Sequence, residues 1–161
     1  MRVYHVLLPV LALALGGCTM EGSTPAATPA AMPQVTQAVA PASGFGGLLN
    51  AARAQAGLPA ATTDARLQAA AVRHVRDMVE NDFFDHGGSD GTRSYDRIAQ
   101  AGYSSCRPAE NIAFGATSEA AVFEMWMGSS GHRANMLMTG NVQYGLAQMA
   151  GKWVMTVARV C

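Results

Sequence analysis

Residues 109–115 read Ala-Glu-Asn-Ile-Ala-Phe-Gly, and this stretch predicts a buried strand that begins with a carboxylate, Glu110. Burying a carboxylate is costly unless a nearby imidazolium or metal ion pairs with it. Two histidines stand on either side of the stretch in sequence. His86 precedes a Gly-Gly pair, and His132 lies in Ser-Gly-His-Arg-Ala-Asn at 130–135. Imidazole and carboxylate together can ligate a divalent cation or exchange a proton near neutral pH. We therefore predict that these three side chains converge on one cleft.

Apolar periodicity predicts that most helices precede most strands. Helices are expected over residues 48–53, 64–81, 95–101 and 118–127, and strands over 112–114, 142–149 and 153–160. The second helix has a regular apolar stripe made of Leu67, Ala70, Ala71, His74 and Met78. In the fourth helix, the side chains of Ala121, Val122, Met125 and Trp126 are expected to face inward. The order predicts an α+β domain in which helices cover a small antiparallel sheet.

The order of these segments and their local residue patterns resemble the CAP superfamily, which is also called the SCP or cysteine-rich secretory/pathogenesis-related family. The resemblance is greatest to the small bacterial secreted branch of that family. The resemblance covers residues 48–160 and rests on the Glu-Asn segment at 110–111, the His-Arg-Ala-Asn segment, and Gly145 in the last hairpin. It implies the CAP fold, a three-layer α-β-α sandwich.

The same resemblance implies that His86, Glu110 and His132 line a central cavity. In the better-known eukaryotic relatives, a second cavity glutamate comes three residues after the tryptophan of the fourth helix, and here that position is Ser129. Glu124 lies two residues before Trp126 and therefore points from a different part of the helix turn. It is expected either to approach the cavity from the side or to face solvent, so a complete His-Glu-Glu-His set is not expected.

Other chemical arrangements are weaker. His74 lies on an apolar stripe, where a core histidine bonded to a backbone carbonyl is expected rather than a ligand. The Ser-Ser pair at 129–130 beside His132 hints at a nucleophile and base, but the chain has no Gly-x-Ser-x-Gly elbow, so a serine hydrolase is disfavoured.

The first 44 residues are not domain-like. Residues 1–17 have one basic residue followed by a short apolar stretch, which predicts a secretory signal. The end, Leu-Gly-Gly-Cys at 15–18, resembles a bacterial lipobox and predicts cleavage before an acylated Cys18, with a plain secretory cut as the alternative. Residues 18–44 are rich in Ala, Pro and Thr and predict a flexible tether to the domain at 45–161. Thr19 in place of Asp favours the outer membrane.

Cysteine use agrees with export, whereas the charge balance says little. With Cys18 acylated, Cys106 and Cys161 form an even pair in an oxidising compartment, and a disulfide is expected rather than free or metal-bound thiols. The chain has 11 basic and 11 acidic residues and no basic run, so nucleic acid is not expected as a partner.

Three functions follow from these features. The first is a monomeric, non-enzymatic binding module in the cell envelope. In it, His86 and His132 hold zinc or another divalent metal beside Glu110 and Ser129, and a groove receives a lipid, sterol or peptide. The second is a metal-assisted hydrolase, for which two histidines, a carboxylate base and an open metal position are chemically sufficient. The third is a structural envelope domain.

Overall fold

The structure is a computed structural model that describes residues 44–161, so the predictions for the signal, Cys18 and residues 19–43 lie outside the described residues. The helices of the described part are α1 (Phe45–Gln55), α2 (Ala65–Glu80), α3 (Ser94–Gln100), α4 (Glu119–Met127) and α5 (Ser130–Met136). The strands are β1 (Thr62–Thr63), β2 (Arg107–Phe114), β3 (Val142–Met149) and β4 (Lys152–Arg159). Within residues 44–161, no helix is long and apolar enough to cross a membrane.

The strands form one sheet in the order β1-β3-β4-β2. The three long strands are antiparallel, as predicted, and β1 adds a short parallel pairing to β3 at one edge. A tight turn joins β3 to β4, because Ala150 and Gly151 both adopt positive φ, at 48° and 77°. Among residues 44–161, strand β2 pairs only with β4 and forms the opposite edge of the sheet, which is where the candidate site lies.

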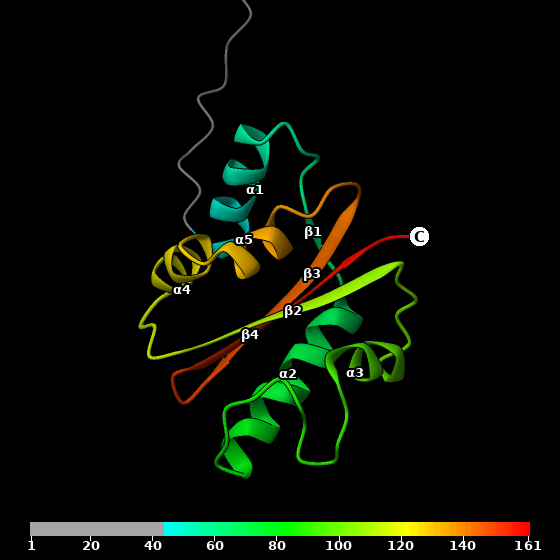
Figure 1. Ribbon diagram of the computed structural model, residues 1–161, viewed down its shortest axis with the longest axis vertical. Helices are drawn as coiled ribbons and strands as arrows, with labels where there is room; N and C mark the ends of the chain where they lie inside the picture. The colour runs from blue at the N-terminus through cyan, green and yellow to red at the C-terminus, as the bar shows by residue number, and fades with distance from the viewer. Residues whose placement is uncertain (1–43) are drawn as a thin grey trace, which may run out of the picture. The chain divides into compact units, whose positions relative to one another are not determined.

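Helices cover both faces of the sheet, which confirms the three-layer α-β-α sandwich (Figure 1). Side chains of β4 alternate between the two faces, as a strand requires. Trp153, Met155 and Val157 pack under α1, α4 and α5, whereas Val154 and Ala158 pack under α2 and α3. Strand β4 is therefore the centre of the core.

Helix α2 lies directly against the sheet. Asp64 caps its start by accepting hydrogen bonds from the backbone N–H groups of Arg66 and Leu67. The predicted stripe is buried throughout: Leu67, Ala70, Ala71, His74 and Met78. The helix approaches β3 so closely that a Cβ at Gly145 would collide with the backbone of Leu67 and Gln68. Glycine at position 145 therefore sets the distance between helix and sheet.

Three sequence-based expectations need correction. Met125 of α4 is 47% exposed rather than inward-facing, and Phe123 is buried instead at 7% exposure. The strand expected at 112–114 extends over Arg107–Phe114, because all eight residues pair with β4 although polar residues interrupt its apolar pattern. Helix α5 was not predicted, because a seven-residue helix containing a glycine carries almost no periodic signal.

A disulfide joins Cys106 to Cys161, as expected from the even cysteine pair, with their Cα atoms 5.1 Å apart. Beside it, the Cys106 N–H donates to the carbonyl of Arg159 at 3.1 Å. The last residue of the chain is thus fastened to the start of β2, the strand that carries Glu110.

Candidate functional site

Glu110 is the centre of a buried polar cluster at the edge strand β2. Its side chain is 1% exposed, and each of its carboxylate oxygens has a partner. Oε2 accepts a hydrogen bond from Arg97 Nη2 at 2.8 Å, and Oε1 accepts one from His86 Nδ1 at 2.9 Å. The structure therefore brings Glu110 and His86 together, and the carboxylate is paired by a guanidinium as well as by an imidazole.

Arg97 of α3 is the member of this cluster that the sequence did not single out. Besides Glu110, its guanidinium donates to the backbone carbonyls of Thr92 at 2.9 Å and His86 at 3.0 Å. It thus ties the loop that carries His86 to both α3 and β2. A buried carboxylate does call for a nearby cation, but nothing in the sequence distinguishes Arg97 from the neighbouring arginines.

His86 lies in the loop after α2, with its side chain half-exposed. The loop turns there because Asp85 Oδ1 accepts a hydrogen bond from the Gly87 N–H at 2.6 Å. The hydrogen bond to Glu110 raises the pKa of His86, with burial opposing it. Because Nδ1 is held by Glu110, the other ring nitrogen, Nε2, is the one that remains available to a ligand.

His74 adds a third imidazole to the cluster, and its Nε2 is held by the backbone. It is fully buried on α2, and its Nε2–H donates to the carbonyl of Asp85 at 2.9 Å. This is the backbone-bonded core histidine that the apolar stripe predicts. Its Nε2 also lies 3.7 Å from Glu110 Oε1, an ion pair only if the ring is protonated. Burial lowers the pKa of His74, so the ring is neutral near pH 7 and the contact is not an ion pair.

His132 reaches the same edge of the sheet from the opposite layer, on α5. Its carbonyl accepts a hydrogen bond from Asn111 Nδ2 at 3.1 Å, and Asn111 Oδ1 accepts one from Asn135 Nδ2 at 2.8 Å. Hydrogen bonds thus join the Glu-Asn and His-Arg-Ala-Asn segments to each other at the sheet edge. Burial lowers the pKa of His132, and the positive charge of His86 lowers it further.

An apolar pocket of about 360 Å³ lies beside His132. It is lined by Phe84, Ile112, Ala113, Phe114, Met125, Trp126, Ser129 and His132. The indole N–H of Trp126 is already used, because it donates to the Ile112 carbonyl at 3.2 Å. Polar contacts to an occupant would come mainly from Ser129 and His132, at the α5 side of the pocket.

The remaining expected site residues are distributed as follows. Ser129 and His132 line the apolar pocket, whereas His86 and Glu110 form the neighbouring polar cluster. Glu124 does not line this pocket. It lines a separate groove between α4 and α1, together with Leu48 and Gln55.

A divalent metal fits this site only in part. Within residues 44–161, no group of three or more His, Cys, Asp or Glu side chains is arranged to hold a metal ion. Both oxygens of Glu110 are already paired, so the two imidazoles of His86 and His132 are the donors that remain. Two imidazoles are too few for a closed four-ligand structural site and are fewer than the three protein ligands of an open catalytic zinc site.

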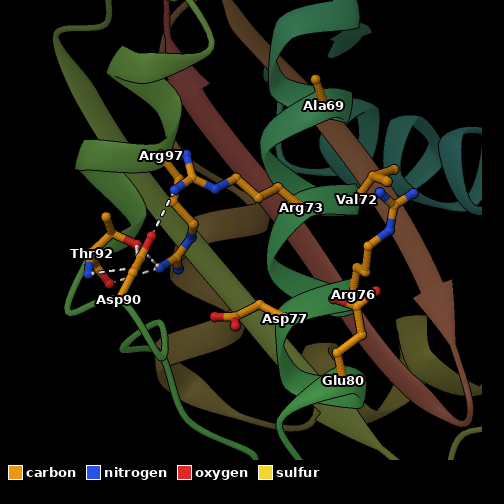
Figure 2. Close-up of a pocket in the computed structure, with 9 residues that line it drawn as sticks. All are labelled: Ala69, Val72, Arg73, Arg76, Asp77, Glu80, Asp90, Thr92 and Arg97. Carbon is orange, nitrogen blue, oxygen red and sulfur yellow. Dashed lines mark hydrogen bonds and ion pairs between the residues drawn. The ribbon is translucent and has the colours of Figure 1, made fainter.

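A second cleft lies on the outer face of α2 and contains none of the expected site residues (Figure 2). Arg73 extends from α2 to Asp90, with Nη2 2.7 Å from Oδ2, and Arg97 lies in the wall of the cleft. Its charged lining residues balance: Arg73, Arg76 and Arg97 against Asp77, Glu80 and Asp90. The formal charges of its lining side chains therefore sum to zero.

The comparison with known families agrees with this fold. A model of the cysteine-rich secretory protein family, CAP, matches residues 47–154. The chain belongs to the CAP family. It is also 34% identical over 90 residues to the uncharacterized protein YkwD of Bacillus subtilis (strain 168). That match covers 56% of this chain and 35% of YkwD, so the chain spans about a third of the length of this relative.

Solved structures share the fold. An extracellular SCP-domain protein from Bacillus anthracis is 25% identical, with a TM-score of 0.68 over 72% of this chain and 39% of that chain. An outer surface protein of Borrelia burgdorferi is 19% identical, with a TM-score of 0.61 over 70% of this chain and 87% of that chain. At that identity, the Borrelia protein shows the fold alone.

Proposed function

We propose that this protein is an extracytoplasmic, lipid-anchored binding module without catalytic turnover. The location is supported by the predicted signal and lipobox, by the disulfide, which suits an oxidising compartment, and by the extracellular description of the Bacillus anthracis relative. Anchoring through Cys18 rests on the sequence alone.

The binding proposal rests on the pocket beside His132, whose walls are apolar and whose lining includes one imidazole. The walls come from β2, α4 and the loop before His86, and the polar groups are confined to Ser129 and His132. A ligand with an apolar body and one polar end matches such a lining. Lipids, sterols and apolar peptides have this character.

His86 and His132 would hold a divalent cation, zinc or another, if one binds here. Glu110 would then act indirectly, by fixing the orientation and tautomer of the His86 ring through Nδ1. A bound cation would offer a Lewis-acidic contact to the polar end of a ligand.

Binding is favoured over hydrolysis because Glu110 is not free to act as a base. Its two carboxylate oxygens are hydrogen-bonded to Arg97 and His86, and acting as a base would require it to give up part of this buried pairing. A metal-assisted hydrolase needs a carboxylate that can accept a proton from water.

The test is zinc titration by isothermal calorimetry on the full chain carrying Cys18→Ser, compared with the same chain carrying His86→Ala and His132→Ala. Glu124→Gln serves as the control, because Glu124 lines a different groove. Circular dichroism establishes that each variant folds. Stoichiometric binding that the double substitution abolishes and the control keeps supports the metal site. A folded wild-type chain that binds no zinc rules out the metal part and leaves a metal-free pocket.

Turnover is tested separately, with ester and peptide substrates. Hydrolysis that Glu110→Gln abolishes in a folded protein would overturn the binding proposal in favour of an enzyme.

A further inference from the structure

Three large apolar side chains protrude around the mouth of the pocket beside His132. Phe84, Phe114 and Met125 are 46%, 60% and 47% exposed. They come from three separate segments: the loop after α2, the end of β2, and α4. We infer that this apolar rim, made of Phe84, Phe114 and Met125, docks on the surface of a lipid bilayer and opens the pocket toward the hydrocarbon.

The rim is one continuous surface. The rings of Phe84 and Phe114 lie with their centroids 6.2 Å apart, and all three side chains line the same pocket. No lining residue carries a carboxylate, ammonium or guanidinium group. Protruding apolar side chains around an uncharged pocket mark interaction surfaces on soluble domains, and hydrocarbon is the partner that needs no hydrogen bonds.

An extended peptide is a poorer occupant, because the bordering edge strand is already capped. A peptide would add to the sheet by pairing with free backbone groups of β2. The Ile112 carbonyl accepts from the Trp126 indole at 3.2 Å, and the Glu110 carbonyl accepts from Asn135 Nδ2 at 3.5 Å. Side chains of α4 and α5 thus occupy the positions that an added strand would use.

The chain enters the domain close to this rim. The Phe45 N–H donates to Glu119 Oε2 at 2.6 Å, which fixes the start of the domain to the first residue of α4. Met125 lies further along the same helix, roughly 9 Å away at a rise of about 1.5 Å per residue.

A flexible tether of the length that the sequence predicts for residues 18–44 would span about 30 Å. This step rests on the proposed acylation of Cys18. Such a tether would hold the rim near the bilayer at a high effective concentration, so even weak insertion would be sufficient to keep the rim bound to the bilayer.

The test is flotation of the full chain carrying Cys18→Ser with vesicles of phosphatidylcholine, a lipid without net charge. The lack of acylation removes the lipid anchor, and because every variant carries the same residues 1–43, differences between variants report the contribution of the domain surface. Phe84→Ser/Phe114→Ser is expected to lower the partition coefficient at least tenfold. Tyr95→Ser/Val160→Ser is the matched control, because these side chains are 57% and 45% exposed but do not line the pocket. The control is expected to stay within about twofold of wild type, with circular dichroism confirming that all variants fold.

A second readout reports whether hydrocarbon enters the pocket. Trp126 lines it, and Trp153→Phe removes the other tryptophan. Vesicles of lipid brominated on the acyl chain are expected to quench Trp126 fluorescence, and the rim variant is expected to lose this quenching.

Three results would overturn the inference: no flotation of the folded chain, equal flotation of wild type and rim variant, or a dimer in lipid-free solution that the rim variant abolishes. The last result would make a second copy the occupant. Zinc binding is measured independently and flotation uses a chain without the acylated cysteine, so failure of the proposed metal site or anchor is distinguishable from failure of bilayer docking.

Discussion

Arg97 and Glu110 form an ion pair that is buried on both sides: Arg97 Nη2 lies 2.8 Å from Glu110 Oε2, and both side chains are 1% exposed. The pair joins α3 to the edge strand β2, and the same guanidinium holds the carbonyl of His86. Removing one partner of such a pair leaves an uncompensated charge in the protein interior, whereas removing both need not destabilise the fold.

Arg97→Met and Glu110→Gln are each expected to lower the free energy of unfolding by about 3–5 kcal/mol. The double variant Arg97→Met/Glu110→Gln is expected to be much less unstable than the sum of the single changes, because no unpaired charge remains. Urea denaturation followed by circular dichroism measures this. Arg76→Met is the control, since Arg76 is an exposed arginine on α2, and its effect is expected within about 0.5 kcal/mol. Additive single effects would contradict the pairing.

The pKa of His86 is expected to lie above the ordinary value of about 6.5 for histidine, because the imidazolium is hydrogen-bonded to Glu110. NMR titration of the histidine ring protons measures it directly. Glu110→Gln should bring the His86 midpoint back down, whereas the pKa of His132, which burial lowers, should stay below the ordinary value. A His86 midpoint that does not respond to Glu110→Gln would contradict the contact.

The same contact makes stability depend on pH. A group whose pKa is raised on folding contributes stability that is complete below its unfolded pKa and is lost as the pH rises through its folded pKa. His86→Gln should therefore cost more stability near about pH 5.5 than near about pH 8.5. Because the imidazole is half-exposed, solvent screening limits the difference to less than about 1 kcal/mol. Thermal unfolding of both proteins at the two pH values measures it, and an equal cost at both would contradict the assignment.

Much of the fold could be predicted from regular patterns. The stripe of α2 is buried as its spacing requires, and β3 has the predicted bounds, because both elements place apolar side chains at the period of their backbone. The miss at Met125 has a physical reason. Helix α4 is apolar nearly all round, so its sequence does not mark which side faces the core.

The site was less predictable than the fold. The sequence placed Glu110 at the start of a buried strand and therefore required a partner for it, but the partner is chosen by tertiary structure. Arg97 arrives from α3, thirteen residues earlier in the chain, and no local pattern encodes that approach. The pocket rim was missed for the same reason, since Phe84 and Phe114 are brought together only by the folded sheet edge.

Gly145→Ala is expected to destabilise the domain by about 1–3 kcal/mol or more, because the added methyl group would collide with the backbone of α2 at Leu67 and Gln68. The helix cannot retreat freely, since Gln68 Nε2 donates to the Leu146 carbonyl at 2.8 Å and Thr156 Oγ1 donates to the Leu67 carbonyl at 2.6 Å. Gly131→Ala is the matched control. A Cβ there meets no atom within 4 Å, and alanine favours the helix, so stability should be unchanged or slightly higher. Urea denaturation distinguishes the two, and equal effects would contradict the close packing of α2 on β3.

Removal of the disulfide by Cys106→Ser/Cys161→Ser is expected to lower the free energy of unfolding by up to about 4 kcal/mol in the chain-entropy model. The bridge closes a separation of 55 residues that includes β2, α4, α5 and the β3–β4 hairpin. Its loss therefore increases the conformational freedom of a large part of the unfolded chain. Wild type unfolded in the presence of a thiol reductant should reproduce the unfolding midpoint of the double variant, and both midpoints should fall below that of oxidised wild type.

Because the bridge fastens the start of β2 through Cys106, amide hydrogen exchange in the variant should increase first at the Arg107 end of that strand. A variant as stable as oxidised wild type would mean that the bridge does not constrain the unfolded state, and the sheet edge that carries Glu110 would then be held by its pairing with β4, the Arg97 pair and the Asn111–Asn135 contact.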